Sequence, residues 1–184
     1  MKKVLIFFAL AGVFSFQAVS AQSISLSAEV KGGYVLPLPN LSNTLNGAIS
    51  YGGAVQAVLP CIPLITKWEV SFNTATLASK NNAANTLALS PLILSGIFDI
   101  PMPGLNPFVK VGGGLIFETS TLIGVVTIQN DPVFIGGVGI SAPLMPAVSI
   151  KVEADYMFIY QTWVTGATEN GSTINLNLGV NAGF

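Results

Sequence analysis

Acidic and basic side chains recur at alternate positions within short apolar segments of this chain. The tightest group is Lys151, Glu153 and Asp155. Two carboxyl groups at this spacing could share a proton and act as a general acid and base. Because a lysine stands at the same spacing, they are more simply its counter-charges, and no acid or base role is assigned. Nine residues are expected to form one structural charge network: Glu29, Lys31, Lys67, Glu69, Lys110, Glu118, Lys151, Glu153 and Asp155.

Other chemistry is excluded by residue types that the chain lacks. It has no histidine, which removes Ser-His-Asp and Cys-His catalysis, the usual zinc sites and an imidazole pH switch. Cys61 is the only cysteine, so we expect a small packing residue and no intramolecular disulfide. Glycine-rich stretches at 112–114 and 136–139 do not stand at a strand-to-helix turn, as a phosphate loop would. With no arginine and a net charge of −1, no nucleic-acid partner is indicated. The sequence predicts a protein that is not an enzyme and has no catalytic, cofactor or metal site.

The first residues have the pattern of an export signal. Lys2 and Lys3 precede an apolar run at residues 4–16, and small residues follow up to Ala21. The apolar run is shorter than the ~20 residues that a transmembrane helix needs. We therefore expect residues 1–21 to be a cleaved signal peptide and residues 22–184 to form a single domain.

Along most of the remaining chain, apolar residues alternate with polar or small ones. The clearest example is 172–184, where Ile174, Leu176, Leu178 and Val180 are separated by asparagine and glycine. A period of two is the pattern of a β-strand with one apolar face. It predicts eight strands, at residues 24–36, 48–59, 67–76, 87–100, 108–119, 133–142, 148–163 and 172–184. The strands at 87–100 and 133–142 are apolar or glycine-rich on both faces, which leaves their orientation open.

The connections between these segments alternate in length. Short proline-rich turns are expected at 60–63, 101–104 and 143–146, and longer polar loops at 37–47, 78–85, 120–131 and 164–171. Short turns on one side and long loops on the other are typical of outer-membrane barrels, in which an even strand number places both termini in the periplasm. Residues are 51% hydrophobic and only 8% charged, which is too little charge for an ordinary soluble surface. The predicted fold class is therefore all-β, an eight-stranded antiparallel up-and-down transmembrane β-barrel.

In such a barrel the apolar faces point to lipid and the charged faces point inward. The nine charged residues would then fill the lumen as salt bridges, and a narrow polar conduit is the alternative. Tyr34, Tyr51 and Tyr160 would face outward at the loop end, and Trp68 and Phe184 near the other end, as two aromatic girdles. A soluble barrel with an apolar interior, or a two-sheet sandwich, would require charged outer surfaces.

The chain resembles the small outer-membrane barrels of the OmpA/OmpX-like type over residues 22–184. The most specific match is the last strand, residues 176–184, which ends in Phe184 and looks like the assembly signal of such barrels. Residues 106–114, with three consecutive glycines, are similar to a recurring strand of that family. The resemblance implies residence in the outer membrane of a Gram-negative-type bacterium, contact with its lipid, and recognition by the insertion machinery through the strand that ends in Phe184.

Two functions are compatible with these features. The first is a structural or surface-interaction role, in which the barrel presents its loops and its lumen is filled by side chains. The second is a narrow, porin-like channel or a carrier of small solutes or apolar molecules, suggested by the apolar residues Ile116, Met157 and Ile159 on lumen-facing positions.

Overall fold

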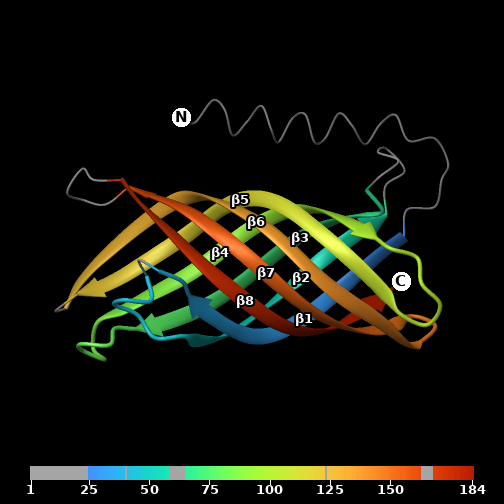
Figure 1. The fold of residues 1–184 in the computed structure, drawn as a ribbon, viewed down its shortest axis with the longest axis horizontal. Helices are drawn as coiled ribbons and strands as arrows, with labels where there is room; N and C mark the ends of the chain where they lie inside the picture. Colours follow the sequence, from blue (N-terminus) through green and yellow to red (C-terminus); the bar gives the residue numbers. More distant parts are fainter. Residues whose placement is uncertain (1–24, 40, 59–64, 123, 163–167) are drawn as a thin grey trace.

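The computed structural model describes residues 25–39, 41–58, 65–122, 124–162 and 168–184. The strands pair antiparallel in sequence order to form a closed barrel (Figure 1). β8 returns to β1 with Val30 opposite Val180, so the described sheet has no open side along its length. The eight strands are β1 (Ser25–Pro37), β2 (Ala48–Val58), β3 (Lys67–Ala78), β4 (Thr86–Asp99), β5 (Asn106–Leu122), β6 (Val125–Met145), β7 (Val148–Thr162) and β8 (Thr168–Gly183). The predicted fold class is confirmed.

β1 begins and β8 ends at the same end of the barrel, which we call the terminal end; the opposite end is the loop end (Figure 1). At the terminal end, β4 and β5 are joined through residues 100–105, and β6 and β7 through Pro146 and Ala147. The predicted turn at 60–63, with Cys61, lies outside the described residues. At the loop end, residues 38–47 and 79–85 connect β1 to β2 and β3 to β4.

Three predicted connections are shorter in the structure. Residues 120–131 were expected to be a loop, but β5 continues to Leu122 and β6 starts at Val125. The β-branched residues of 125–128 extend the ladder, and Gly124 with φ +80° closes the tight turn. β8 starts at Thr168, within the predicted loop at 164–171. β6 runs through the predicted turn at 143–146 as far as Met145, with an irregular register at Pro143 and Met145.

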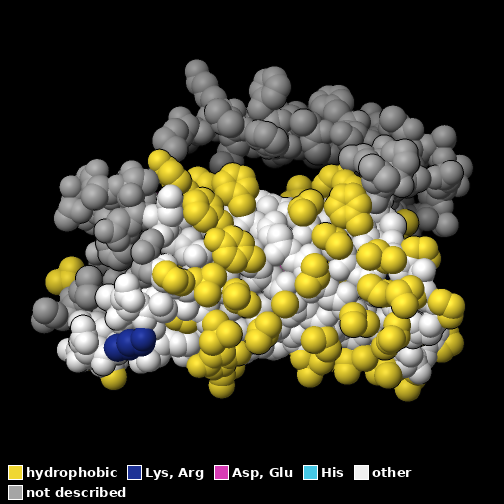
Figure 2. All heavy atoms as spheres, viewed as in Figure 1, with side chains coloured by type: hydrophobic (Ala, Val, Ile, Leu, Met, Phe, Trp, Pro, Cys, Tyr) yellow, Lys and Arg dark blue, Asp and Glu magenta, His cyan; other side chains and the backbone are white. Residues whose placement is uncertain are grey.

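Side chains alternate between the two faces of the wall as the period of two predicts. Val30 on the outer face is 75% exposed, whereas its neighbours Glu29 and Lys31 are buried in the lumen. β4, whose orientation the sequence left open, buries Leu89 and points Leu92 outward. Hydrophobic side chains cover the face shown in Figure 2, on which acidic side chains are not visible. Charge inside and apolar surface outside is the reverse of what a soluble barrel requires.

Glycines on the lumen side make room for the larger side chains of adjacent strands. A Cβ at Gly179 would lie 2.6 Å from Glu29 Oε1, and one at Gly137 would overlap Asp155 Oδ1. Gly112 stands in the same way against Ser95. The glycine-rich stretches of β5 and β6 thus have a packing role, because they free space where charged and polar side chains must fit.

Between β3 and β4 the ladder is interrupted at one place. Paired residues run up to Phe72 and Leu92 and resume at Ala75 and Leu89. Pro91 lies inside the gap, and it has no backbone N–H to donate.

In the part of the chain that is described, no helix has the length and apolar character needed to cross a membrane.

Candidate functional site in the barrel lumen

A cluster of ion pairs occupies the lumen nearer the terminal end. Its side chains come from alternate strands, β1, β3, β5 and β7, and every one of them is at most 6% exposed. The register of the antiparallel ladders brings these charged positions to a similar depth of the barrel. The period of two directs their side chains into the lumen. The members of this ion cluster are Lys31, Lys110, Lys151, Glu29, Glu69, Glu153 and Asp155.

Lys151 lies at the centre of the ion cluster. Its Nζ is 3.0 Å from a carboxylate oxygen of Glu29, Glu69 and Glu153. An ammonium group has three N–H donors, so these three carboxylates satisfy its donors. The same nitrogen lies 5.0 Å from the centre of the Phe108 ring, a cation–π distance.

The other two lysines of the cluster link the remaining carboxylates. Lys110 Nζ donates to Asp155 Oδ2 at 2.9 Å and to Glu153 Oε2 at 3.1 Å. Lys31 Nζ donates to Glu153 Oε1 at 2.8 Å. Glu153 therefore contacts all three lysines, and the charges in this part of the lumen form one connected network.

Neutral amides add hydrogen bonds to the cluster. Gln56 Nε2 donates to Glu69 Oε2 at 2.7 Å and to Glu29 Oε2 at 3.1 Å. Asn177 Nδ2 donates to Glu153 Oε1 at 3.3 Å. These two residues were not singled out from the sequence, although each occupies a lumen-facing position on an even-numbered strand. Buried charges persist only when they are paired and hydrogen-bonded, and each carboxylate of the cluster has at least one lysine partner and one hydrogen bond. One oxygen each of Glu29, Glu69 and Asp155 accepts no hydrogen bond.

Two of the nine predicted network residues lie apart from the ion cluster. Lys67 Nζ pairs with Asp99 Oδ2 at 2.9 Å at the terminal end, where the lysine side chain is 34% exposed. Asp99 was not predicted, although it follows Ile97 at the next inward position of β4. Glu118 is buried toward the loop end, in the same half of the lumen as Asp131, whose Oδ2 accepts from Gln129 Nε2 at 2.7 Å. Asp131 was missed because residues 120–131 were expected to form a loop.

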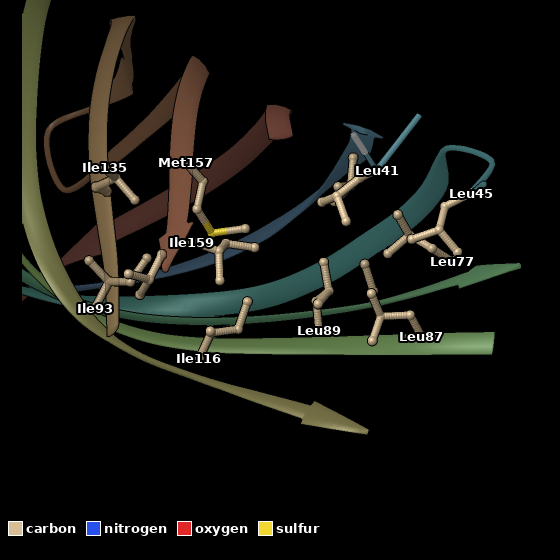
Figure 3. Packing of buried hydrophobic residues seen from close by; sticks show 13 residues of the cluster. Leu41, Leu45, Leu77, Leu87, Leu89, Ile93, Ile116, Ile135, Met157 and Ile159 are labelled. Carbon is tan, nitrogen blue, oxygen red and sulfur yellow. The ribbon is translucent and has the colours of Figure 1, made fainter. Parts of the chain in front are cut away.

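Apart from Glu118, Asp131 and a few neutral polar residues, the buried side chains in the half of the lumen nearer the loop end are apolar. Ile116, Met157 and Ile159, the residues that suggested a carrier, are completely or almost completely buried. They pack with one another and with further buried residues in the cluster shown in Figure 3. The members of this apolar cluster are Val35, Leu41, Leu45, Ala75, Leu77, Leu87, Leu89, Ile93, Ile116, Val133, Ile135, Met157 and Ile159.

Leu41 and Leu45 enter the apolar cluster from the loop at 38–47, where Leu45 lies beside Leu77 (Figure 3). Leu45 N donates to Leu41 O at 2.9 Å, which makes one helical turn of this segment. Lys80 holds the turn in place, because its backbone N donates to Thr44 O and its Nζ donates to Ser42 O. The loop therefore covers the loop end of the lumen with its own leucines.

Two small cavities inside the barrel wall are lined by described residues alone. One of about 10 Å³ lies beside Ser50, Asn73 and Met157, and is the size of a single water molecule. The other, of about 70 Å³, lies at the terminal end between Lys67 and Lys151. Both are far smaller than the ~300 Å³ of a typical ligand pocket.

Among the described residues, no group of three or more His, Cys, Asp or Glu side chains is placed to hold a metal ion.

The fold and the charged lumen together define a class: the chain has the fold of the small eight-stranded outer-membrane β-barrels. No family model matches the sequence, and no curated protein matches it. Among solved structures, the barrel is similar to Neisserial surface protein A (NspA), with a TM-score of 0.62 and 15% identity over 90% of this chain and 100% of that one.

Two further structures have the same fold. A major outer membrane protein from Thermus thermophilus matches with a TM-score of 0.57 and 14% identity, over 89% of this chain and 100% of the other. The N-terminal β-barrel domain of Pseudomonas aeruginosa OprF matches with a TM-score of 0.51 and 18% identity, over 85% and 96% of the two chains. At these identities the likeness establishes the fold.

Proposed function

We propose that this protein is an integral outer-membrane barrel with a structural or surface-interaction role, and that it carries out no catalysis. The observation that supports this function best is the filled lumen, in which the ion cluster and the apolar cluster succeed one another along the barrel axis. An eight-stranded barrel is just wide enough for its own side chains to fill. Such a barrel acts through its wall and its loops.

The outer face supports residence in a bilayer. Lipid can cover exposed residues such as Val30, Ile49 and Phe134, which would be a liability in water. Tyr34, Tyr51 and Tyr160 are exposed near the loop end and Phe184 at the terminal end, as interfacial aromatic girdles would be. Lipid of the outer membrane is therefore the first partner that we propose.

The route to the membrane follows from the two ends of the sequence. We infer that residues 1–21 direct export and are removed, that residues 22–184 form the barrel, and that β8 with Phe184 is recognised by the insertion machinery. Phe184 N donates to Leu26 O at 3.0 Å, which places the last residue against β1 where the barrel closes.

A narrow conduit is the second candidate. The observation that favours it is the cavity of about 70 Å³ at the terminal end. It extends from Lys67, which forms a partly exposed pair with Asp99, to the buried Lys151. Water in this cavity would reach the ion cluster from one end of the lumen. Conduction would then require rearrangement of both the ion cluster and the apolar cluster.

Ion conductance of the refolded protein in a planar bilayer distinguishes the two candidates. The filled lumen predicts no conductance steps for the wild-type barrel, under conditions in which a known porin conducts. If the wild type shows conductance steps and Lys67→Glu makes them more selective for cations, the conduit is established and the filled lumen is refuted, because residue 67 lies at the entrance of the conduit. If Lys67→Glu leaves the steps unchanged, they come from a defect in the bilayer around the protein.

A further inference from the structure

Two proline-containing turns at the terminal end expose large apolar side chains. The turn between β4 and β5 presents Ile100, Met102 and Leu105, and the turn between β6 and β7 presents Leu144 and Met145. All five side chains are between 46% and 67% exposed. Both turns lie at the end of the barrel that also holds the C-terminus (Figure 1). Turns in water are built mainly from small and polar residues, so these side chains require a cover.

No charged side chain interrupts this surface. Residues 100–109 contain none, and neither do residues 132–150, which run from β6 through the turn into β7. A partner that is recognised through salt bridges would find no counterpart here. Binding at these turns would therefore depend on apolar contact.

The exposed surface of the turns is continuous with the outer wall of the barrel. Ile100 continues the outward row of β4 that includes Leu94, and Leu144 continues the outward row of β6 that includes Ile140. Hydrophobic side chains in Figure 2 extend along the wall to its terminal end. The lipid that covers the wall therefore also reaches the turns, without a boundary of charged residues between them.

The height of the wall places the turns at the second surface of the membrane. From Tyr160 to Ile150, ten residues of β7 span about 33 Å along the strand, or about 25 Å along the axis at a tilt of about 40°. That is the height of the apolar band of such barrels. If Tyr160 marks the outer interface, Val148 lies about 5 Å beyond the hydrocarbon, inside a headgroup layer that is about 5–7 Å thick.

The turn between β4 and β5 is stiff and stands beside the other turn. Pro101 and Pro103 restrict its backbone, and Ile100 N donates to Pro107 O at 2.7 Å. β5 pairs with β6 as far as Asn106, so the two turns are neighbours around the barrel. A stiff turn loses little conformational entropy when it enters an ordered layer.

We propose that the turns at 100–105 and 143–147 bind the phospholipid of the periplasmic leaflet, with Met102, Leu144 and Met145 inserted among the headgroups. Phospholipid is the occupant because the surface is apolar, uncharged and continuous with the lipid-covered wall. The turns then fix the depth at which the barrel lies in the membrane. The proposal rests on the proposed function, because it requires the wall to stand in the bilayer.

Depth-dependent fluorescence quenching tests this placement. In a Cys61→Ser background, single probes of nitrobenzoxadiazole are attached at Met102→Cys, Met145→Cys, Val152→Cys or Asn43→Cys. The protein is folded into phosphatidylcholine vesicles whose acyl chains carry a nitroxide near the glycerol backbone. We expect about threefold more quenching at 102 and 145 than at 43, because the loop at 38–47 lies outside the headgroup layer.

The probe at Val152, in the middle of the wall, distinguishes the two ways to fail. If 152 is quenched but 102 and 145 are quenched no more than 43, the turns face water, where a periplasmic protein could bind them, and the proposal is overturned. If 152 is not quenched by nitroxides at any depth of the acyl chain, the proposed membrane function fails as well. Quenching at 102 and 145 that falls as protein concentration rises would show a second copy on the turns and would also overturn the proposal.

Two variants exchange an equally exposed apolar side chain for a polar one of similar shape. Met145→Gln acts in the turn, and Val125→Thr acts at the tip of the β5–β6 hairpin, where the residues are 67% and 65% exposed. Val125 lies on the loop side of Pro132, which stands opposite Tyr160. In urea titration in vesicles, Met145→Gln should lower the folding equilibrium constant about fivefold, since its side chain leaves lipid on unfolding. Val125→Thr should leave it unchanged, and equal effects would refute lipid contact at the turn.

Discussion

Lys151 donates to three carboxylates in a region of the lumen that solvent barely reaches. Its removal would leave Glu29 and Glu69 with fewer cations in a medium of low dielectric constant. When one partner of a buried ion pair is removed, the loss of stability is far larger than the stability that the intact pair contributes. At the scale of single residues, Lys151 is therefore where we expect the largest electrostatic effect.

Lys151→Met should lower the free energy of unfolding by about 3–5 kcal/mol, measured by urea titration in detergent micelles. The matched control is Lys67→Met, which removes the same charge from the partly exposed pair with Asp99. It should cost about 0–1 kcal/mol. Equal, small effects of both variants would mean that water enters the ion cluster, which would favour the conduit.

Two glycines of the neighbouring strands β5 and β6 test the packing role of glycine. A Cβ at Gly114 would overlap the carbonyl oxygen of Leu92, which belongs to the backbone and cannot turn away. At Gly136, a Cβ would have no atom within 4 Å beyond the glycine and its two neighbours in the chain. Gly114→Ala should thus destabilise the barrel by about 1–3 kcal/mol, while Gly136→Ala should be neutral or slightly stabilising. Thermal unfolding in detergent compares them, and a reversed order would contradict the packing at β4.

At the scale of elements, β7 shows how the period of two separates two environments. Val152 is exposed on the outer face between Ile140 and Leu178, its partners on β6 and β8. Its neighbours Lys151 and Glu153 are buried in the lumen. A shift of one residue in the register would exchange the two faces completely.

Val152→Arg should therefore place a charge in hydrocarbon and cost about 2–4 kcal/mol near the midplane of the bilayer. The measurement is urea unfolding in lipid vesicles. Val152→Leu serves as the control and should have little effect. If the arginine variant were as stable as wild type, this face of β7 would not be in contact with the lipid core.

The last strand makes a second prediction at this scale. Phe184 is 79% exposed, so its ring adds little packing to the folded barrel. If β8 carries an assembly signal, deletion of Phe184 should lower the amount of folded protein in the membrane more than deletion of the loop residue Asn82. Heat-modifiable mobility on gels, measured on isolated membranes, quantifies the folded fraction. Equal folded yields from the two deletions would count against recognition through the last residue.

At the scale of the whole molecule, the interior changes character along the barrel axis. The half nearer the terminal end holds the ion cluster, and the half nearer the loop end holds the apolar cluster with Leu41 and Leu45 from a loop. Ions that crossed the lumen would have to pass both a network of paired charges and a region lined mainly by apolar side chains. The two regions therefore oppose conduction by different physical means.

The molecule as a whole should be recovered with outer membranes when it is expressed with residues 1–21. A polar lumen and an apolar wall are stable in this arrangement only when lipid covers the wall. Sucrose-gradient fractionation, followed by circular dichroism of the purified protein in detergent, tests this expectation. Recovery as a soluble periplasmic monomer would contradict membrane insertion.

The sequence by itself was sufficient to predict eight strands, the faces of six of them and the closed antiparallel topology. These features depend on local regularities: the period of two in segments such as 148–163, and the alternation of short and long connections. Strand ends were less predictable, as the extension of β6 to Val125 shows. A β-branched segment after a glycine can continue a strand or form a loop, and pairing with β5 decided between them.

Only the tertiary structure decided which charged residues meet. Lys67 has the same spacing from Glu69 as Lys151 has from Glu153, yet Lys67 pairs with Asp99 at the terminal end. The strands are staggered around the barrel, so equal positions in the sequence reach different depths of the lumen. Gln56 and Asn177 enter the ion cluster for the same reason, and Leu41 reaches the apolar cluster because a loop folds inward. Sequence periodicity determines the face on which a side chain lies, whereas strand stagger and loop packing determine its partners.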